Sequence, residues 1–346
     1  MATFKIESEQ LEQLITERLV ESGISLEHAS IVADVLAFAD TRGVKSHGIM
    51  RLQHYIDRIQ EGGINKDAQI TVEAVNDVIV KVDGDNGLGH VVAKIAMNEA
   101  ISISREKGIG VSIASNSSHS GALGYYADQA AREGVIGITF AQADALVAPY
   151  GARSAFLGAN PLAVGIPHED RPIVLDMSTS NVAFGKVMIE KERGNKIPMD
   201  WGLDEHGVPT DDPDKVKALQ PMGGAKGYGL AILVDVLSGI LSGGQFGKHI
   251  KPMYGDLKES RRLGQFFLAI NPEFFVGQEY FLDMMKRFVE ELHACEPAPG
   301  HTKVYVPGER SIENQMRANL EGIEIEEDMY EILTGKKRSN KNTACK

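Results

Sequence analysis

The chain has 346 residues, of which 48 are acidic and 36 are basic, so its formal net charge is −12. Hydrophobic residues make up 43% and charged residues 24%, a composition typical of globular proteins, and a chain of this length is expected to form about two domains. The acidic balance argues against a nucleic-acid partner or an anionic membrane, because both are held by clustered Lys and Arg side chains.

The two cysteines, Cys295 and Cys345, argue against a disulfide scaffold, and the Cys and His spacings of a zinc site are missing. Residues 1–10 lack the pattern of a secretory signal. The most apolar run, 227–241, contains Asp235 and is too short to cross a bilayer. We therefore expect a cytoplasmic protein that requires no metal.

The first 60 residues predict three helices. Apolar side chains recur at helical spacing from Leu11 to Leu19, and a helix there would end at Gly23. We expect the three helices to begin at the N-cap residues Ser8, Ser25 and Ser46.

From about residue 70, short β-rich runs alternate with helical segments, which favours an α/β fold. The glycines at 84, 87 and 89 follow a predicted strand, but they lack the G-x-G-x-x-G spacing of a standard Rossmann fingerprint. The predicted strands are 78–82, 110–114, 135–140 and 173–175, and the predicted helices are 91–107, 121–133 and 182–193.

The last third of the chain returns to helix after a proline-containing segment, 194–225, that is expected to be a loop. We predict a mainly helical domain from residues 1–70, 226–262 and 310–335, and an α/β domain from 71–225 and 263–309. Residues 336–346 are polar and expected to be disordered. The predicted elements are a buried helix over 228–241, a strand over 266–270, an amphipathic helix over 281–293, a short strand over 304–306 and a helix over 311–320.

The first candidate site is Ser46-His47-Gly48 with Arg51 and Tyr55. Positions 47, 51 and 55 would lie one turn apart on one helix face, just after a helix start. A helix N-terminus attracts anions, and Arg can bind a carboxylate through two hydrogen bonds, so the group predicts a site for a small anionic molecule. The alternative is an ordinary solvated polar face.

The second candidate is His119, within Ser117–Gly121, in the loop between a predicted strand and the next helix. Ligands bind in such loops of α/β proteins, and a neutral His there could act as a general base. Asp144 follows the next strand and could orient His119 or a polar group of the substrate. An ordinary loop histidine and a turn or capping Asp are the alternatives.

Two further segments suit a cofactor. Asp176-Met177-Ser178 again follows a strand, and Lys226 lies in the glycine-rich run 223–229 at a helix start, a combination that suits a phosphate-bearing molecule. The alternative is a glycine-rich turn with a solvated lysine. Polar loops at three successive strand ends are more suggestive together than any one alone.

Taken in order, these motifs resemble the type-2 malate/L-lactate dehydrogenase family from about Ile6 to Tyr330. Three stretches, 120–134, 253–275 and 321–325, resemble one branch of that family in particular. The other anchors are Ser46-His47-Gly48, Ser118-His119-Ser120-Gly121, 158–163, Asp176-Met177-Ser178, 226–230, 297–300 and 307–310.

The resemblance implies an NAD-dependent dehydrogenase that oxidises a small anionic 2-hydroxy acid. His119 would be the catalytic base, with Asp144 nearby. The substrate pocket would be lined by Ser46, His47, Arg51 and Tyr55, with Arg261 added. The implied cofactor contacts are Asp176, Met177, Ser178, Lys226, Gly308, Glu309 and Arg310.

The resemblance also implies an α/β fold of atypical kind, in which a non-Rossmann, mixed-sheet dinucleotide-binding domain lies beside a mainly helical domain, and the protein forms a homodimer. NAD is expected rather than NADP. Relatives can carry a hydroxyl residue at position 143, and Ala143 here would lose that side-chain hydrogen bond to the cofactor. A sibling enzyme with another 2-hydroxy acid substrate, or a non-catalytic protein that binds organic acids, is the alternative.

Overall fold

The computed structural model describes residues 3–335. The predicted disordered tail, 336–346, lies outside these residues. The first helices are α1 (Ser8–Glu21) and α2 (Leu26–Thr41). Ser25 caps α2 as predicted, since its side chain accepts a hydrogen bond from the backbone of His28. The prediction for Ser8 is wrong by one residue, because Glu7 is the N-cap and Ser8 already belongs to the helix.

The third predicted helix starts later than expected. Helix α3 covers Leu52–Glu61, and the residues before it form two 3₁₀ turns, Lys45–His47 and Ile49–Arg51, so Ser46 is not a helix N-cap. The reason is Asp40 on α2. Its carboxylate accepts a 2.7 Å hydrogen bond from the Ile49 backbone, and a Cβ added at Gly48 would lie 2.1 Å from the same carboxylate. The chain therefore turns at a residue without a side chain.

A seven-stranded mixed sheet forms the centre of the molecule, in the order β2-β3-β4-β11-β5-β6-β7. β3 and β4 run parallel, and every other neighbouring pair in this sheet is antiparallel. The late strand β11 lies between two early ones. The strands are β2 (Thr71–Ala74), β3 (Ile79–Asp83), β4 (Ile109–Ser117), β5 (Ile136–Ala141), β6 (Leu162–Ile166), β7 (Ile173–Met177) and β11 (Leu263–Ile270).

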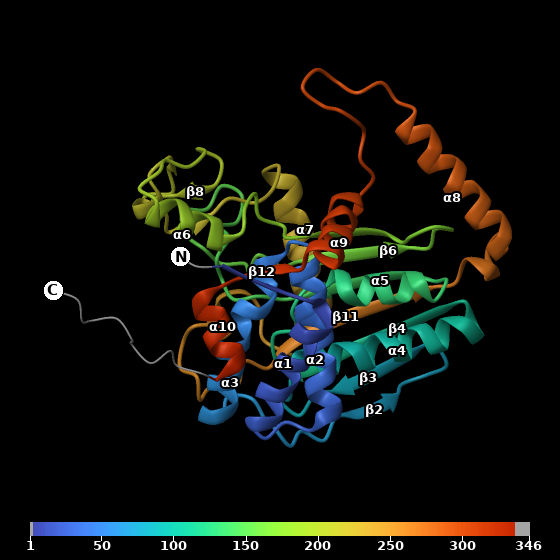
Figure 1. The fold of residues 1–346 in the computed structure, drawn as a ribbon, viewed down its shortest axis with the longest axis horizontal. Coiled ribbons are helices and arrows are strands. Elements are labelled where there is room, and N and C mark those ends of the chain that lie inside the picture. The colour runs from blue at the N-terminus through green and yellow to red at the C-terminus, as the bar shows by residue number, and fades with distance from the viewer. Residues whose placement is uncertain (1–2, 336–346) are drawn as a thin grey trace.

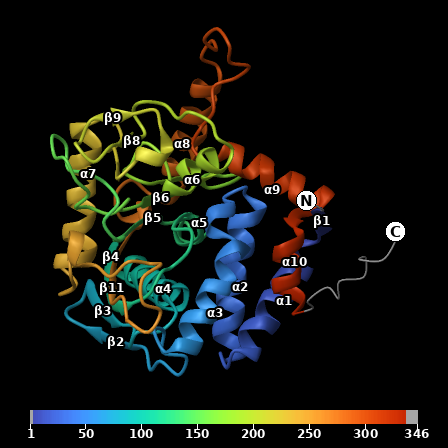
Figure 2. The same cartoon turned by 90° about the vertical axis from the view of Figure 1, so that its left-hand side faces the viewer.

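Helices cover both faces of this sheet (Figures 1 and 2). α4 (Gly89–Lys107) and α5 (Gly124–Arg132) lie between the sheet and α2, and α7 (Ala225–Asp235) lies on the opposite side. The fully buried Phe267 of β11 contacts the Tyr126 ring of α5 edge-on, with 6.1 Å between the ring centres. A second apolar core joins α1, α2 and α3 to the chain's last segments.

Those last segments include elements that the sequence patterns did not predict. β12 (Ile323–Glu326) pairs antiparallel with β1 (Thr3–Ile6), and α10 (Glu327–Thr334) follows it. The segment expected to be a loop, 194–225, contains a small sheet of β8 (Gly202–Leu203), β9 (Pro209–Thr210) and β10 (Ala218–Leu219). α6 (Phe184–Glu192) precedes this sheet, as predicted.

Two predictions for the late chain need correction. No strand forms over 304–306, where the Val306 N–H donates to the Glu309 carboxylate instead of to a neighbouring strand. The helix over 228–241 is only partly buried: α7 runs into a π-helical turn, Val236–Ile240, and the Ile240 side chain is 53% exposed. The helices predicted over 281–293 and 311–320 are confirmed as α8 (Gln278–His293) and α9 (Glu309–Glu321).

A glycine allows α5 to approach the sheet. A Cβ added at Gly165 of β6 would lie 1.9 Å from the Ala127 carbonyl oxygen of α5, so Gly165→Ala must push the helix away. We expect this variant to lower the free energy of unfolding by roughly 1–3 kcal/mol, the usual cost of overpacking a core. Gly185 of α6 is the control, because an added Cβ there meets no atom within 4 Å and Gly185→Ala favours helix. Equal urea midpoints for the two variants would contradict this expectation.

Candidate active site

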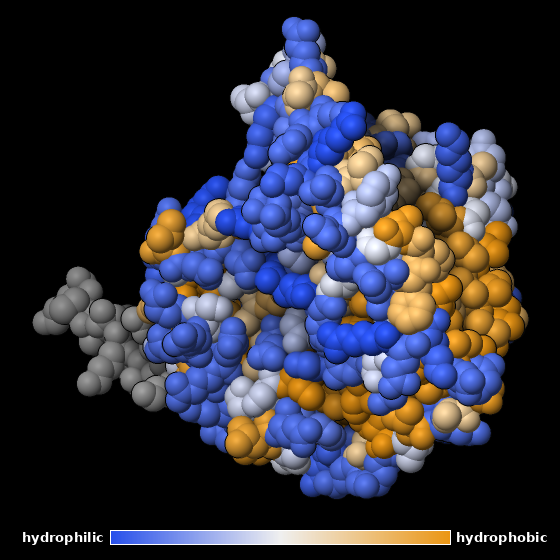
Figure 3. Space-filling model, turned by 90° about the vertical axis from the view of Figure 1, so that its right-hand side faces the viewer, coloured by the Kyte–Doolittle hydropathy of each residue, from blue (hydrophilic) through white to orange (hydrophobic). Residues whose placement is uncertain are grey.

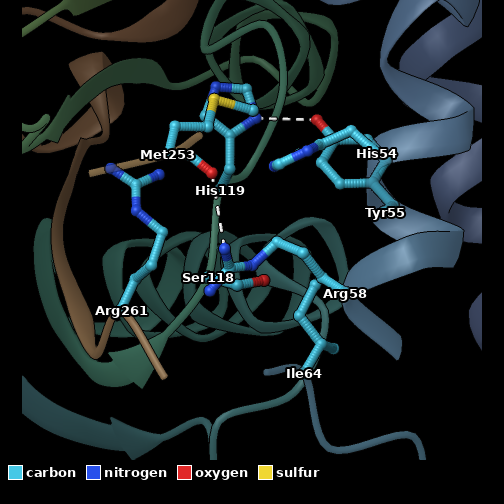
Figure 4. A pocket seen from close by; sticks show the side chains of 8 residues that line it. All are labelled: His54, Tyr55, Arg58, Ile64, Ser118, His119, Met253 and Arg261. Atoms are coloured by element: carbon cyan, nitrogen blue, oxygen red, sulfur yellow. Dashed lines mark hydrogen bonds between the residues drawn. The ribbon is translucent and has the colours of Figure 1, made fainter. Parts of the chain in front are cut away.

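A hydrogen bond between His119 and Tyr55 marks the centre of the site (Figure 4). The Tyr55 hydroxyl and the His119 Nδ1 lie 2.7 Å apart. His119 stands in the loop between β4 and α5, whereas Tyr55 comes from α3. The backbone of Gly121 makes a longer contact, 3.3 Å, with the same Nδ1. Both partners line a pocket at the junction of the helical layer and the sheet.

The surroundings of His119 keep its ring neutral. Burial lowers the pKa of His119 well below its ordinary value of 6.5, and nearby His47, Arg51, His90 and Arg261 lower it further. The ring of His47 stacks on that of His119 with 5.6 Å between centres. A neutral imidazole has a nitrogen lone pair at pH 7, so His119 is ready to accept a proton.

The candidate substrate-binding residues before α3 are joined to one another by hydrogen bonds. The Ser46 hydroxyl and the His47 Nδ1 lie 2.9 Å apart, and the Arg51 Nε donates a 2.7 Å hydrogen bond to the Ser46 carbonyl oxygen. An Arg51 Nη1 also donates to the Tyr254 hydroxyl. Arg51 forms no ion pair with a carboxylate of residues 3–335, so its charge is open to an anionic ligand.

No hydrogen bond joins Asp144 to His119 in residues 3–335, and the side chain hydrogen-bonded to His119 is that of Tyr55. Asp144 instead forms an ion pair with Arg261, whose side chain is 97% buried and lines the same pocket. The Arg261 Nε donates to the Lys251 carbonyl oxygen at 2.9 Å. A buried guanidinium needs such partners to offset its lost hydration, which explains why the carboxylate lies here.

The sequence analysis missed several residues at the site. His54, Arg58 and Met253 line the pocket, and the fully buried His90 contacts the Tyr55 ring edge-on at 4.9 Å between centres. His54 directly precedes Tyr55, a predicted site residue, so the sequence could have indicated His54 as a further candidate. The other positions carried no such signal, because they come from a helix face and a distant loop that only the fold brings together.

The cofactor candidates at the ends of β7 and before α7 share one backbone framework. The Thr179 N–H donates to the Ala159 carbonyl at 2.9 Å, and the Met222 N–H donates to the Thr179 carbonyl at 2.9 Å. These bonds bring Ser178, which precedes Thr179, to the glycine-rich turn that leads to Lys226. Lys226 is exposed in the first turn of α7 and makes no hydrogen bond or ion pair with another described side chain.

Asp176 lies at the N-terminus of α5. Its Oδ2 accepts a 2.8 Å hydrogen bond from the Gly124 N–H, and a Cβ at Gly124 would lie 2.7 Å from that oxygen. Desolvation of the carboxyl group raises the pKa of Asp176 to about 6, although the hydrogen bond from Gly124 and the charge of Arg42 act in the opposite direction. The next residue, Met177, ends β7 opposite Leu162.

The segment around Gly308 packs on β7. The Val174 N–H donates to the Pro307 carbonyl at 3.3 Å, and Gly308 has a φ of +94°, which favours glycine. The Glu309 carboxylate is already engaged, because its Oε1 lies 2.7 Å from the His293 Nε2. The Arg310 guanidinium stacks over the Tyr305 ring at 4.5 Å.

Ala143 has no side-chain hydroxyl to offer a cofactor. Its N–H donates a 3.1 Å hydrogen bond to the Asn160 side chain, so the backbone donor is already used. Within residues 3–335 no group of three or more His, Cys, Asp or Glu side chains could hold a metal ion. No helix in the same range is long and apolar enough to cross a membrane.

Comparisons with known proteins identify the family of this chain. Residues 6–334 match the family model for malate/L-lactate dehydrogenase. The chain belongs to this family. It is 43% identical over 330 residues to a ureidoglycolate dehydrogenase (NAD(+)) of Escherichia coli K12, covering 95% of each chain. It is 39% identical to a malate dehydrogenase of Pyrococcus horikoshii, over 88% of this chain and 87% of the relative.

The solved structure of a sulfolactate dehydrogenase from Methanocaldococcus jannaschii superposes with a TM-score of 0.91. The two sequences are 36% identical, and the match covers 96% of each chain. The family predicted from the motifs is therefore confirmed, the chain is a dehydrogenase, and its mixed α/β fold is that of solved dehydrogenases.

The buried histidines of the dehydrogenase predict that acid destabilises it. Burial lowers the pKa of His90 to about 3 and that of His47 to about 4. As the pH falls below 6.5, these histidines bind protons in the unfolded chain but stay neutral in the folded protein. The free energy of unfolding therefore decreases, by at most about 1.4 kcal/mol per pH unit for each histidine. His90→Gln should make this dependence shallower in urea unfolding at pH 7.5, 6 and 5. An unchanged slope would contradict the assignment to His90.

Proposed function

We propose that this dehydrogenase oxidises (S)-ureidoglycolate to oxalurate with NAD, a reaction of allantoin breakdown in purine catabolism. The observation that carries the reaction type is the neutral, buried His119, hydrogen-bonded to Tyr55 in a pocket near the uncompensated charge of Arg51. The substrate rests on the resemblance of residues 120–134, 253–275 and 321–325, and on the 43% identical relative that bears this name.

Each residue has a role in this proposal. Arg51, with His47, holds the substrate carboxylate through charge-assisted hydrogen bonds. His119 takes the proton of the carbinol hydroxyl as that carbon loses a hydride. A base is needed because hydride loss alone would leave a protonated carbonyl, and proton transfer of this kind contributes roughly 10²–10⁴-fold to the rate.

NAD, when bound, supplies the hydride acceptor, and the residues present fit it. Lys226 is a cation at a helix N-terminus without an ion-pair partner in the part of the chain that the structure describes, which suits a pyrophosphate. Asp176 and Ser178 lie at the adjacent end of β7, and an acidic side chain favours the ribose hydroxyl of NAD over the 2′-phosphate of NADP. The dinucleotide would thus be held without a G-x-G-x-x-G motif, by a sheet that is mostly antiparallel.

A sibling activity is the second candidate. The malate and sulfolactate dehydrogenases that resemble this chain act through the same fold, and the charge of Arg51 suits any 2-hydroxy acid. A non-catalytic acid-binding role, in contrast, has no use for a neutral buried base.

A homodimer is part of the proposal, because α8 buries none of its side chains against the rest of residues 3–335. The helix stands apart from the body of the molecule in Figure 1, and none of its residues is buried. Tyr280, Met284 and Phe288 follow one another at helical spacing and are 43% to 58% exposed. Figure 3 shows apolar side chains gathered over one side of the surface as well. An amphipathic helix left uncovered in this way suits a second copy of the chain.

Steady-state turnover tests the activity. We expect NADH to appear with (S)-ureidoglycolate and NAD, more slowly with NADP, and more slowly with malate, lactate and sulfolactate. His119→Ala should reduce kcat by at least about 10²-fold while NADH still binds, measured by its fluorescence. Near-normal turnover of this variant would remove His119 from the base role. Preferred turnover of malate or sulfolactate would favour the sibling enzyme.

Light scattering after gel filtration tests the dimer. We expect twice the chain mass of 37.6 kDa. Phe288→Glu places a charge in the apolar stripe of α8 and should shift the protein toward the monomer. Glu290→Lys, on the other side of the helix, is the matched control and should leave the mass unchanged. A monomeric wild type would refute this part of the proposal.

A further inference from the structure

The segment 158–161, directly before β6, contains a buried asparagine that bridges two distant parts of the chain. Asn160 is fully buried. Its Nδ2 donates a 3.0 Å hydrogen bond to the Ala231 carbonyl oxygen of α7, and its Oδ1 accepts a 3.1 Å hydrogen bond from the Ala143 N–H. The φ of Asn160 is +33°, in the left-handed region that asparagine adopts more readily than most residues. One side chain therefore ties α7 to the residues that follow β5.

On one side this bridge leads to the substrate pocket. Ala143 directly precedes Asp144, whose carboxylate forms the ion pair with Arg261, and Arg261 lines the pocket together with His119. The contact is close, because a Cβ added at Gly158 would lie 2.2 Å from the Ala143 carbonyl oxygen. A shift of Ala143 would therefore move Asp144, and with it the support of the Arg261 guanidinium.

On the other side the bridge leads to the candidate cofactor residues. The Ala159 carbonyl oxygen accepts two hydrogen bonds from Thr179, one from its N–H at 2.9 Å and one from its hydroxyl at 3.0 Å. Thr179 directly follows Ser178 at the end of β7. Helix α7, to which the Asn160 side chain is bonded, has Lys226 in its first turn. Both elements that carry cofactor candidates are thus attached to the segment 158–161.

We propose that Asn160 is a positioning residue that couples the cofactor region to the substrate pocket. Binding of a dinucleotide at Ser178 and Lys226 would fix the end of β7 and α7, and Asn160 would pass this constraint through Ala143 to the Asp144–Arg261 pair. Transfer of a hydride requires the two reactants to be held in a narrow range of geometries, which such a link would favour. The inference rests on the proposed function for the place of the cofactor.

Hydrogen–deuterium exchange tests the coupling without a substrate. The peptides to follow are 142–147 and 259–265, which contain Ala143 and the Asp144–Arg261 pair. We expect NADH to slow their exchange in wild type at least about fivefold, the lower end of usual coupling between two sites. Asn160→Gly tolerates the left-handed φ but removes both side-chain hydrogen bonds. This variant should still bind NADH, measured by fluorescence, and the slowing of exchange should be lost.

The rate of hydride transfer tests the consequence for catalysis. It is measured in a single turnover with the best wild-type substrate among ureidoglycolate, malate, lactate and sulfolactate. We expect Asn160→Gly to slow this step by about 10²-fold, the effect of a misplacement of about 1 Å, while the dissociation constant of NADH changes by less than about threefold. Gly158→Ala pushes Ala143 away without altering the Asn160 side chain, and it should give the same split if Asn160→Gly folds poorly.

Asn86→Gly is the matched control. Asn86 also has a left-handed φ, +56°, and its Nδ2 also donates one hydrogen bond to a backbone carbonyl, that of Gly63, at 3.1 Å. Among residues 3–335, its hydrogen bonds do not reach α7 or the segment 142–144. This variant should leave both the exchange response and the rate of hydride transfer unchanged. Thermal unfolding establishes that each variant is folded.

The outcomes separate this inference from the proposed function. A wild type whose two peptides do not respond to NADH overturns the coupling. The coupling is also overturned if Asn160→Gly retains the full response, because NADH would then act on these peptides directly. Turnover of malate but not of ureidoglycolate refutes only the named substrate, since the exchange measurement needs none. Binding of NADPH but not of NADH refutes the choice of NAD, and NADPH then serves as the probe of exchange.

Discussion

The hydrogen bond from Tyr55 to His119 joins the two layers of this protein. Tyr55 belongs to the helical layer and is fully buried, whereas His119 follows strand β4 of the seven-stranded sheet. The bond therefore depends on how α2 and α3 pack against the sheet, and that packing depends on Asp40 holding the turn at Gly48. Asp40 and Gly48 lie outside the pocket, yet they help to fix the position of His119, because the closely packed elements between them have little room to shift.

Electrostatics act locally in this acidic protein. The net charge of −12 would repel an anionic substrate and an anionic cofactor. The candidate sites nevertheless contain a few cationic side chains at defined positions. Arg261 is compensated by Asp144, whereas Arg51 and Lys226 have no carboxylate partner among residues 3–335. At a Debye length of about 8 Å in physiological salt, these near charges outweigh the distant acidic surface. Burial, and after it nearby charges that include Arg51, lowers the pKa of His47, His54 and His119 and keeps these rings neutral at pH 7.

The motifs predicted from the sequence were short and local, and the structure places many of them at one junction. Ser46, His47, Arg51 and Tyr55 do lie near His119, although the 3₁₀ turns before α3 replace the single helix that was expected. Asp144 pairs with Arg261, because a buried guanidinium more than 100 residues away in the sequence needs its charge. Periodicity could not anticipate that pairing, nor the two hydrogen bonds of the Asn160 side chain, since they join separate segments of the chain.

The sequence by itself determined the family, the alternation of strands and helices, and most of the polar residues at the strand ends, because these features reside in local spacing and in motifs. Only the tertiary structure decided where β11 is inserted between β4 and β5, which partner His119 has, and which cations stay uncompensated. It also decided that α7 and α8 leave apolar faces exposed. The physical reason is that pairing, burial and charge compensation depend on residues far apart in the chain, and they are fixed only when the layers pack together.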